Sequence, residues 1–192
     1  MKQKEETPRT LAGELYYWLQ TFAVGLTVLV LLMVFVGRPI RVDGHSMEPT
    51  LHGNQEEEGG IQDVMLVRSL GYTPRTGDVV VLHKDFDAAN EPIVKRVIAT
   101  GGQTVQIDYA AGTVTVDGTV LEEDYILEPM VQKGWQTITE MTVPEGSVFV
   151  MGDNRNVSAD SRDATLGAVD CRYILGQAVA VVFPFQDIKG LF

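Results

Sequence analysis

The hydrophobic pattern divides the chain into one long apolar run near its start and a series of short β-branched runs after it. Residues 15–37 carry no charged side chain. As a helix with a rise of about 1.5 Å per residue, this run would measure about 34 Å, enough to cross the hydrocarbon core of a bilayer. Tyr16, Tyr17 and Trp18 would then lie at one membrane interface. The pattern therefore predicts a transmembrane anchor helix over residues 15–37.

A cleavable signal peptide is the alternative interpretation of this run. Its apolar region would be roughly 7 to 15 residues long and would end in small residues. The run in this chain is longer, and residues 35–39 (Phe-Val-Gly-Arg-Pro) offer no such cleavage site. We therefore expect an anchor that stays attached to the protein.

After residue 38 the pattern changes to short apolar runs separated by turn residues, which is typical of antiparallel β structure. The predicted strands are Val79 to Leu82, Ile93 to Ala99, Thr104 to Tyr109, Thr113 to Val116, Ser147 to Met151 and Tyr173 to Phe183. Ala111-Gly112 and Asp117-Gly118 are predicted as hairpin turns. The predicted fold class is thus mostly β, with a single N-terminal transmembrane helix followed by an antiparallel β-sheet domain.

Charge and cysteine content remove several classes of function. The net charge of −11 offers no basic surface for nucleic acid. The single cysteine, Cys171, excludes an internal disulfide. The carboxylates of residues 56–58 are adjacent and repel one another, so they predict an exposed loop rather than a metal site. We expect no metal and no cofactor.

A Ser-His-Asp triad is the first catalytic arrangement to consider. His45 adjoins Ser46, but neighbouring side chains of an extended segment point to opposite faces, so His45 is badly placed to accept the Ser46 proton. His52 and His83 have no motif around them. The histidines therefore give only weak support to a triad.

Four segments in fixed order resemble the motifs of bacterial type I signal peptidases, peptidase family S26. They are Gly44-His45-Ser46-Met47-Glu48-Pro49-Thr50-Leu51, Thr76-Gly77-Asp78-Val79-Val80-Val81-Leu82, Lys95-Arg96-Val97-Ile98 and Gly152-Asp153-Asn154-Arg155-Asn156-Val157-Ser158-Ala159-Asp160-Ser161-Arg162. The first follows a membrane span, as in that family. The match is closer to the Gram-positive branch because residue 44 is glycine, where other relatives carry a serine that acts as a second oxyanion donor.

The resemblance implies that Ser46 is the nucleophile, Lys95 the general base, and Ser158 a hydroxyl that hydrogen-bonds and orients the lysine amine. The backbone N–H of Ser46 would hold the oxyanion. A free lysine has a pKa near 10.4 and is neutral in only roughly one molecule in 2,500 at pH 7, so a base lysine must be buried. Strand alternation places Ile93 and Val97 on the face of Lys95. Without the other motifs, Lys95 would be interpreted as a strand residue that reaches water.

The resemblance also implies supporting residues. Asp153 is expected to pair with Arg96, which points away from Lys95, and Asp160 with Arg162. Gly152 would allow a close approach of the backbone. These residues would support the geometry without taking part in proton transfer.

The family would make the chain a Ser-Lys serine endopeptidase that cleaves signal peptides from exported preproteins after small residues, in Ala-x-Ala sites. Its partners would be those signal peptides and the lipid bilayer, close to the protein translocation channel. The expected division is a cytoplasmic tail at residues 1–14, the anchor at 15–37, and an extracytoplasmic catalytic domain at 38–192.

Three other interpretations stay open. A sortase-type transpeptidase would use Cys171 with a histidine and Arg172, although the usual sequence context is missing. A self-cleaving repressor shares the Ser-Lys chemistry but needs a DNA-binding domain. A non-enzymatic anchored β module would keep the motifs only as scaffold. Met47 could either pack in the core or belong to an exposed rim that dips into lipid.

Overall fold

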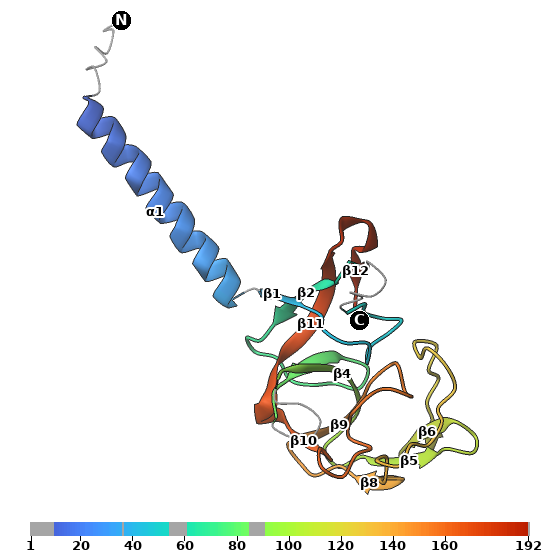
Figure 1. Cartoon of the computed structure of the whole chain (residues 1–192). Coiled ribbons are helices and arrows are strands. Elements are labelled where there is room, and N and C mark those ends of the chain that lie inside the picture. Colours follow the sequence, from blue (N-terminus) through green and yellow to red (C-terminus); the bar gives the residue numbers. More distant parts are fainter. Residues whose placement is uncertain (1–9, 36, 54–60, 85–90, 192) are drawn as a thin grey trace, which may run out of the picture.

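The computed structural model of the chain describes residues 10–35, 37–53, 61–84 and 91–191. The carboxylates of residues 56–58 and the basic side chains before residue 10 lie outside these ranges. Within them the chain forms one α-helix, twelve β-strands and two short 3-10 helices, η1 (Cys171–Tyr173) and η2 (Phe185–Asp187) (Figure 1). The predicted mostly β fold with one N-terminal apolar helix is confirmed.

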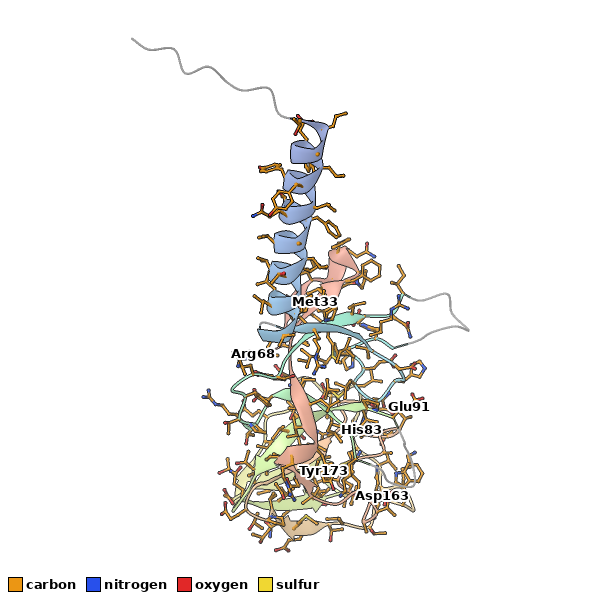
Figure 2. The ribbon with its side chains drawn as sticks, turned by 90° about the vertical axis from the view of Figure 1, so that its left-hand side faces the viewer. Met33, Arg68, His83, Glu91, Asp163 and Tyr173 are labelled. Atoms are coloured by element: carbon orange, nitrogen blue, oxygen red, sulfur yellow. The ribbon has the colours of Figure 1, made fainter. Side chains whose placement is uncertain are left out.

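Helix α1 (Leu11–Phe35) stands apart from the β body. Thr10 begins it, because its side-chain Oγ1 accepts a hydrogen bond from Gly13 N at 3.3 Å. The described side chains of α1 are exposed on every side (Figure 2), and Leu11–Val34 has the length and hydropathy of a membrane span. The helix starts four residues before the predicted anchor, at Leu11, and it ends at Phe35, before the predicted end at residue 37. Pro39 favours extended backbone at Arg38, which prevents the helix from continuing there.

The larger sheet carries eight strands, all paired antiparallel, in the order β1-β2-β11-β3-β4-β9-β10, with β12 added beside β11. These strands are β1 (Arg38–Arg41), β2 (Val64–Arg68), β3 (Val79–Leu82), β4 (Ile93–Thr100), β9 (Ser147–Met151), β10 (Val169–Asp170), β11 (Ile174–Phe183) and β12 (Lys189–Gly190).

A smaller antiparallel sheet has the order β7-β6-β5-β8. Its strands are β5 (Thr104–Asp108), β6 (Thr113–Val116), β7 (Thr119–Val120) and β8 (Glu140–Thr142). The predicted Asp117-Gly118 turn connects β6 to β7, and both residues have positive φ (50° and 80°), as a two-residue hairpin turn requires. The predicted turn at Ala111-Gly112 lies between β5 and β6.

The register of the central strands brings the second, third and fourth motifs together. Val80 on β3 pairs with Lys95 on β4, and Arg96 pairs with Met151 at the end of β9. Met151 is followed directly by Gly152. The lysine motif therefore lies in the buried middle of the sheet, next to the start of the segment 152–162, which we call the 152–162 loop.

Candidate active site

Ser46 lies in a turn formed by residues 44–51, which we call the nucleophile turn. Leu51 N donates a hydrogen bond to Met47 O at 2.9 Å, and both side chains are buried in one apolar cluster. From the other side, Asn154 N of the 152–162 loop donates to the Ser46 carbonyl at 3.1 Å. The turn is thus fixed at both sides of the nucleophile. The burial of Met47 excludes its alternative placement in a rim that dips into lipid.

Lys95 extends from β4 to Ser46, the nucleophile that the sequence resemblance implied. Its Nζ lies 2.7 Å from Ser46 Oγ and donates a hydrogen bond to the Val94 carbonyl at 2.9 Å. Val80, which pairs with Lys95 from the adjacent strand β3, is fully buried, and so is Val97. The lysine itself is 3% exposed. A neutral amine that donates one N–H to Val94 has its lone pair free to accept the Ser46 proton.

Burial is the main influence on the ionisation of Lys95. It lowers the pKa of Lys95 from 10.5 to about 8, because the charged ammonium loses its hydration. The nearby carboxylates of Asp160 and Asp153 oppose this change, and the guanidinium of Arg162 adds to it. The amine is therefore much more easily deprotonated than a lysine in water.

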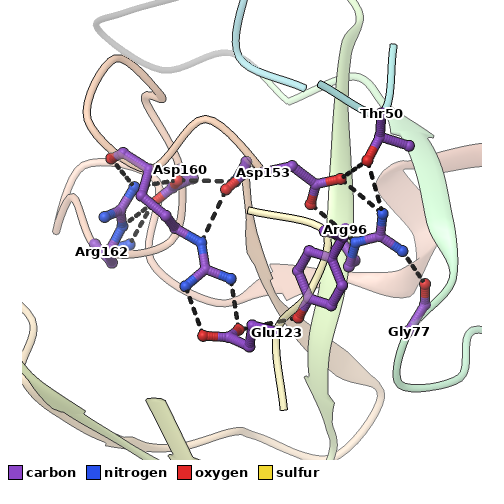
Figure 3. Close-up of polar contacts among 10 residues, drawn as sticks. Thr50, Gly77, Arg96, Glu123, Asp153, Asp160 and Arg162 are labelled. Atoms are coloured by element: carbon purple, nitrogen blue, oxygen red, sulfur yellow. Dashed lines mark hydrogen bonds and ion pairs between the residues drawn. The ribbon is translucent and has the colours of Figure 1, made fainter. Parts of the chain in front are cut away.

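Arg96 points to the opposite side of β4 and connects its own motif with the other three (Figure 3). It donates two hydrogen bonds to the Asp153 carboxylate, from Nε at 2.8 Å and from Nη2 at 2.6 Å. Nη1 donates to the Gly77 carbonyl at 2.9 Å, and Thr50 of the nucleophile turn donates to Asp153. The pairing of Arg96 with Asp153 is as the sequence resemblance implied. It also holds the nucleophile turn against the lysine strand.

Asp160 and Arg162 form a second, fully buried ion pair, with contacts of 2.8 Å and 2.7 Å. Burial opposes ionisation of the Asp160 carboxyl, but its bonds to Arg162 and to Gly152 N keep its pKa below the usual range. A Cβ on Gly152 would lie 2.4 Å from the Ser46 carbonyl oxygen and 2.3 Å from Ser158 Oγ. The close approach expected at Gly152 is present, and it is an approach to the nucleophile.

Ser158 is fully buried beside Gly152, but the expected hydrogen bond to the Lys95 amine is not formed. Its Oγ has no hydrogen-bond partner among the described residues. The hydroxyl is close enough to the Asp160 carboxylate to help lower its pKa without making a well-aligned bond. In this state Val94 and Ser46, rather than Ser158, orient the lysine.

Two of the three histidines lie beside carboxylates. His45 Nδ1 lies 2.9 Å from Glu48 Oε1, and His52 Nδ1 lies 3.5 Å from Asp63 Oδ2. The nitrogen at hydrogen-bond distance from the nucleophile belongs to the lysine. Among the described residues, no group of three or more histidine, cysteine or acidic side chains is arranged to hold a metal ion.

Cys171 lies in η1 and lacks the surroundings of a reactive thiol. Burial and the neighbouring Asp170 raise the pKa of its thiol, which disfavours the thiolate. Arg172, its proposed partner in a transpeptidase, is exposed and bound to Asp170 at 2.7 Å. The geometry does not support the sortase-type alternative.

Sequence reasoning missed three side chains that reach the site, Glu123, Tyr125 and Arg155. Arg155 lies within the last motif, so that motif was the one available signal. Glu123 and Tyr125 belong to the segment between β7 and β8, where no motif marks them.

Comparison with known proteins gives consistent matches. The family described as "Signal peptidase, peptidase S26" matches residues 15–183. A signal peptidase I of Bacillus licheniformis is 33% identical over 191 residues, covering 96% of this chain and 97% of the relative. A probable signal peptidase I-1 of Synechocystis sp. is 37% identical over 171 residues, covering 84% of this chain and 79% of the relative. The crystal structure of a signal peptidase I from Enterococcus faecalis V583 matches with a TM-score of 0.46 and 28% identity, covering 56% of this chain and 98% of that one.

Proposed function

This chain belongs to the signal peptidase family, peptidase S26, and from that premise we propose that it is a membrane-bound serine endopeptidase with a Ser46–Lys95 dyad. It removes N-terminal signal peptides from exported preproteins. The observation that carries this proposal is the 2.7 Å separation between Lys95 Nζ and Ser46 Oγ, with the lysine buried and its pKa lowered to about 8. A hydroxyl next to a base of that kind is an activated nucleophile.

In the proposed reaction, neutral Lys95 accepts the Ser46 proton while Oγ forms a bond to the carbonyl carbon of the scissile peptide. The negative charge on the carbonyl oxygen is stabilised by the Ser46 backbone N–H, which has no hydrogen-bond acceptor among the described residues. The Lys95 ammonium then protonates the leaving amine as the C–N bond breaks. Lys95 next takes a proton from water, whose oxygen attacks the carbonyl carbon of the acyl-serine ester. The Lys95 ammonium returns a proton to Ser46 Oγ as the ester C–O bond breaks, which releases the cleaved signal peptide and restores the free serine and the neutral lysine.

The supporting residues have distinct tasks in this proposal. Gly152 allows the 152–162 loop to bind the Ser46 carbonyl. The Arg96–Asp153 pair fixes that loop against β4, and the Asp160–Arg162 pair holds the loop together from within. Gly44 has no side chain, so a second oxyanion donor would have to come from elsewhere in the site.

The preferred cleavage sites have small residues at positions −3 and −1, as in Ala-x-Ala. Helix α1 anchors the enzyme in the cell membrane, with residues 1–14 in the cytoplasm and residues 38–192 outside it. That placement brings the catalytic domain close to the protein translocation channel, where exported chains emerge. The family and the candidate span support these proposed assignments.

The test uses the full chain in detergent with a preprotein or a fluorogenic signal-peptide substrate. Ser46→Ala and Lys95→Ala should each abolish cleavage. The combined change of the three histidines to alanine, and Cys171→Ala, should leave substantial activity, as should EDTA. Retained cleavage in Ser46→Ala, or loss with EDTA that a divalent metal reverses, would overturn the dyad.

A bulky residue in place of the −1 alanine of the substrate should stop cleavage. Unchanged processing of that substrate would contradict the proposed specificity for small residues without contradicting the dyad.

A further inference from the structure

An aromatic ring outside the four motifs covers the arginine that adjoins the catalytic lysine. Tyr125 lies in the segment between β7 and β8, and its ring centroid is 4.1 Å from Arg96 Cζ. At this distance the face of the ring attracts the guanidinium by a cation–π interaction. The hydrogen bonds that Arg96 donates lie in the guanidinium plane and restrain movement within that plane. The ring lies against a face of the guanidinium, so it restrains movement out of the plane.

The hydroxyl of the same tyrosine enters a buried ion pair. It donates to Glu123 Oε1 at 2.9 Å, and Glu123 accepts two hydrogen bonds from the Arg155 guanidinium. The side chains of Arg155 and Glu123 are 0% and 6% exposed. Arg155 Nε donates to the Gly152 carbonyl at 3.0 Å. Tyr125 is therefore linked to β4 by its ring and to the start of the 152–162 loop by its hydroxyl.

We propose that Tyr125 is a positioning residue for the Ser46–Lys95 reaction, whose ring acts through Arg96 and whose hydroxyl bond to Glu123 helps to hold the ring in place. This inference rests on the proposed function. The ring keeps Arg96 against Asp153 and limits the access of water to that pair, whose side chains are 11% and 0% exposed. Because Arg96 is adjacent to Lys95 in β4, a displaced guanidinium would also displace the base from the nucleophile.

The pairing of Arg96 also affects the charge that Lys95 experiences. The charged groups that influence Lys95 are Asp160 and Asp153, which favour its ammonium, and Arg162, which disfavours it. A loosened Arg96 would leave more of the Asp153 charge uncompensated. The lysine would then keep its proton to higher pH, and the neutral base would be scarcer at a given pH.

The experiment compares Tyr125→Leu and Tyr125→Phe with Tyr109→Phe, measuring kcat, KM and the pH dependence of kcat on a signal-peptide substrate. Both Tyr125 variants lose the hydroxyl bond to Glu123, but only Tyr125→Leu loses the aromatic face. Tyr109→Phe is the matched control, because the Tyr109 hydroxyl is buried and has no hydrogen-bond partner in the part of the chain that the structure describes. Thermal unfolding of each protein gives the folded fraction.

For Tyr125→Leu we expect kcat to fall roughly tenfold to a hundredfold. We expect KM to change by less than about twofold, because the residue acts on the reacting groups and not on substrate binding. The midpoint of the rise of kcat with pH should move upward. Tyr125→Phe should recover most of kcat and the wild-type midpoint, and Tyr109→Phe should match wild type. If Tyr125→Leu does not fold, Tyr125→Met fills the space without an aromatic face and has the same expected result.

Equal kcat values and equal midpoints in Tyr125→Leu and Tyr125→Phe would overturn the inference, because the ring would then have no role beyond packing. That result leaves the proposed function intact if wild type cleaves and Ser46→Ala does not. If wild type fails to cleave any signal-peptide substrate, the proposed function fails, and the inference fails with it.

Discussion

Lys95 is a side chain that would be charged in water but is held out of water in the folded protein. Burial lowers its pKa from 10.5 to about 8, so the unfolded state binds more protons than the folded state between those two values. Stability should therefore rise with pH across that window, and the full cost of burying the lysine should be present below pH 8. A difference of this size corresponds to about 3 kcal/mol.

The first prediction is that Lys95→Met is inactive but more stable than wild type at pH 7. The free energy of unfolding should increase by up to about 3 kcal/mol, because methionine has no ionisable group and its burial does not require an ammonium to lose its hydration or its proton. The difference should shrink as the pH rises from 8 towards 10.5. Urea unfolding of the full chain in detergent, at pH 7 and at pH 10, measures it. If wild type were more stable than Lys95→Met at pH 7, burial of the amine would cost little stability.

In the proposed Ser46–Lys95 dyad, the same titration governs catalysis. Because the base must be neutral, the rate should increase with pH as the Lys95 ammonium loses its proton, with a midpoint at about 8. The second prediction is therefore a rise in kcat centred at that pH, measured with a signal-peptide substrate in detergent. A profile that follows a group near 10.4, like a lysine in water, would refute the buried base.

Ser158 gives a sharper test at the residue scale, because its buried hydroxyl makes no well-aligned hydrogen bond to any described residue. A buried hydroxyl that forms no hydrogen bond costs stability, so its presence calls for a functional reason. The third prediction is that Ser158→Ala leaves the unfolding midpoint unchanged or raises it, while kcat falls roughly tenfold to a hundredfold. Wild-type kcat in this variant would show that the hydroxyl does not contact the lysine amine during the reaction.

At the scale of elements, the 152–162 loop and the nucleophile turn touch through backbone atoms. Their contact depends on the missing side chain of Gly152, where a Cβ would lie 2.4 Å from the Ser46 carbonyl oxygen. The fourth prediction is that Gly152→Ala displaces Ser46 and lowers kcat by roughly a hundredfold or more. Gly134→Ala is the matched control, because a Cβ there has no atom within 4 Å. Wild-type kcat in Gly152→Ala would show that the turn can yield without moving its nucleophile.

The strands that carry the site were predictable from the sequence because both of their faces are buried. Such strands consist of nearly continuous apolar residues, which stand out in the sequence. β3 and β9 are short apolar runs and were predicted with their observed ends, while β4 extends one residue further than expected. β1 was missed because its four residues include a proline and two arginines. β7, β10 and β12 are two residues long, which is too short for an alternating pattern.

The contacts of the site could be predicted from the sequence only where both residues lie in motifs of the family that the sequence resembles. The pairs Arg96–Asp153 and Asp160–Arg162 followed from the resemblance. Glu123 and Arg155 are separated by 32 residues, and their pairing depends on how the segment after β7 folds back onto β9. No local periodicity encodes such a contact, so it becomes visible only in three dimensions.

At the scale of the whole molecule, the catalytic body has an apolar surface on the side where α1 joins it. The hairpin of β11 and β12 stands beside the C-terminal end of α1 (Figures 1 and 2). Its turn carries Phe183, Phe185 and Ile188 as exposed side chains, with Phe185 79% exposed. A bilayer that surrounds α1 would face this turn, so membrane contact would bury apolar surface that the isolated chain leaves in water.

The last prediction concerns the side of the membrane on which this body lies. Lys2, Lys4 and Arg9 precede the span, whereas Arg38 and Arg41 follow it, so the basic side chains alone favour a cytoplasmic N-terminus only weakly. The proposed substrates add the stronger argument, because a signal peptide becomes accessible to its peptidase where the exported chain emerges. Protease added to intact spheroplasts should therefore digest the β body while a cytoplasmic marker protein stays whole. Digestion only after permeabilisation would place the catalytic domain in the cytoplasm and would contradict both the topology and the proposed access to exported chains.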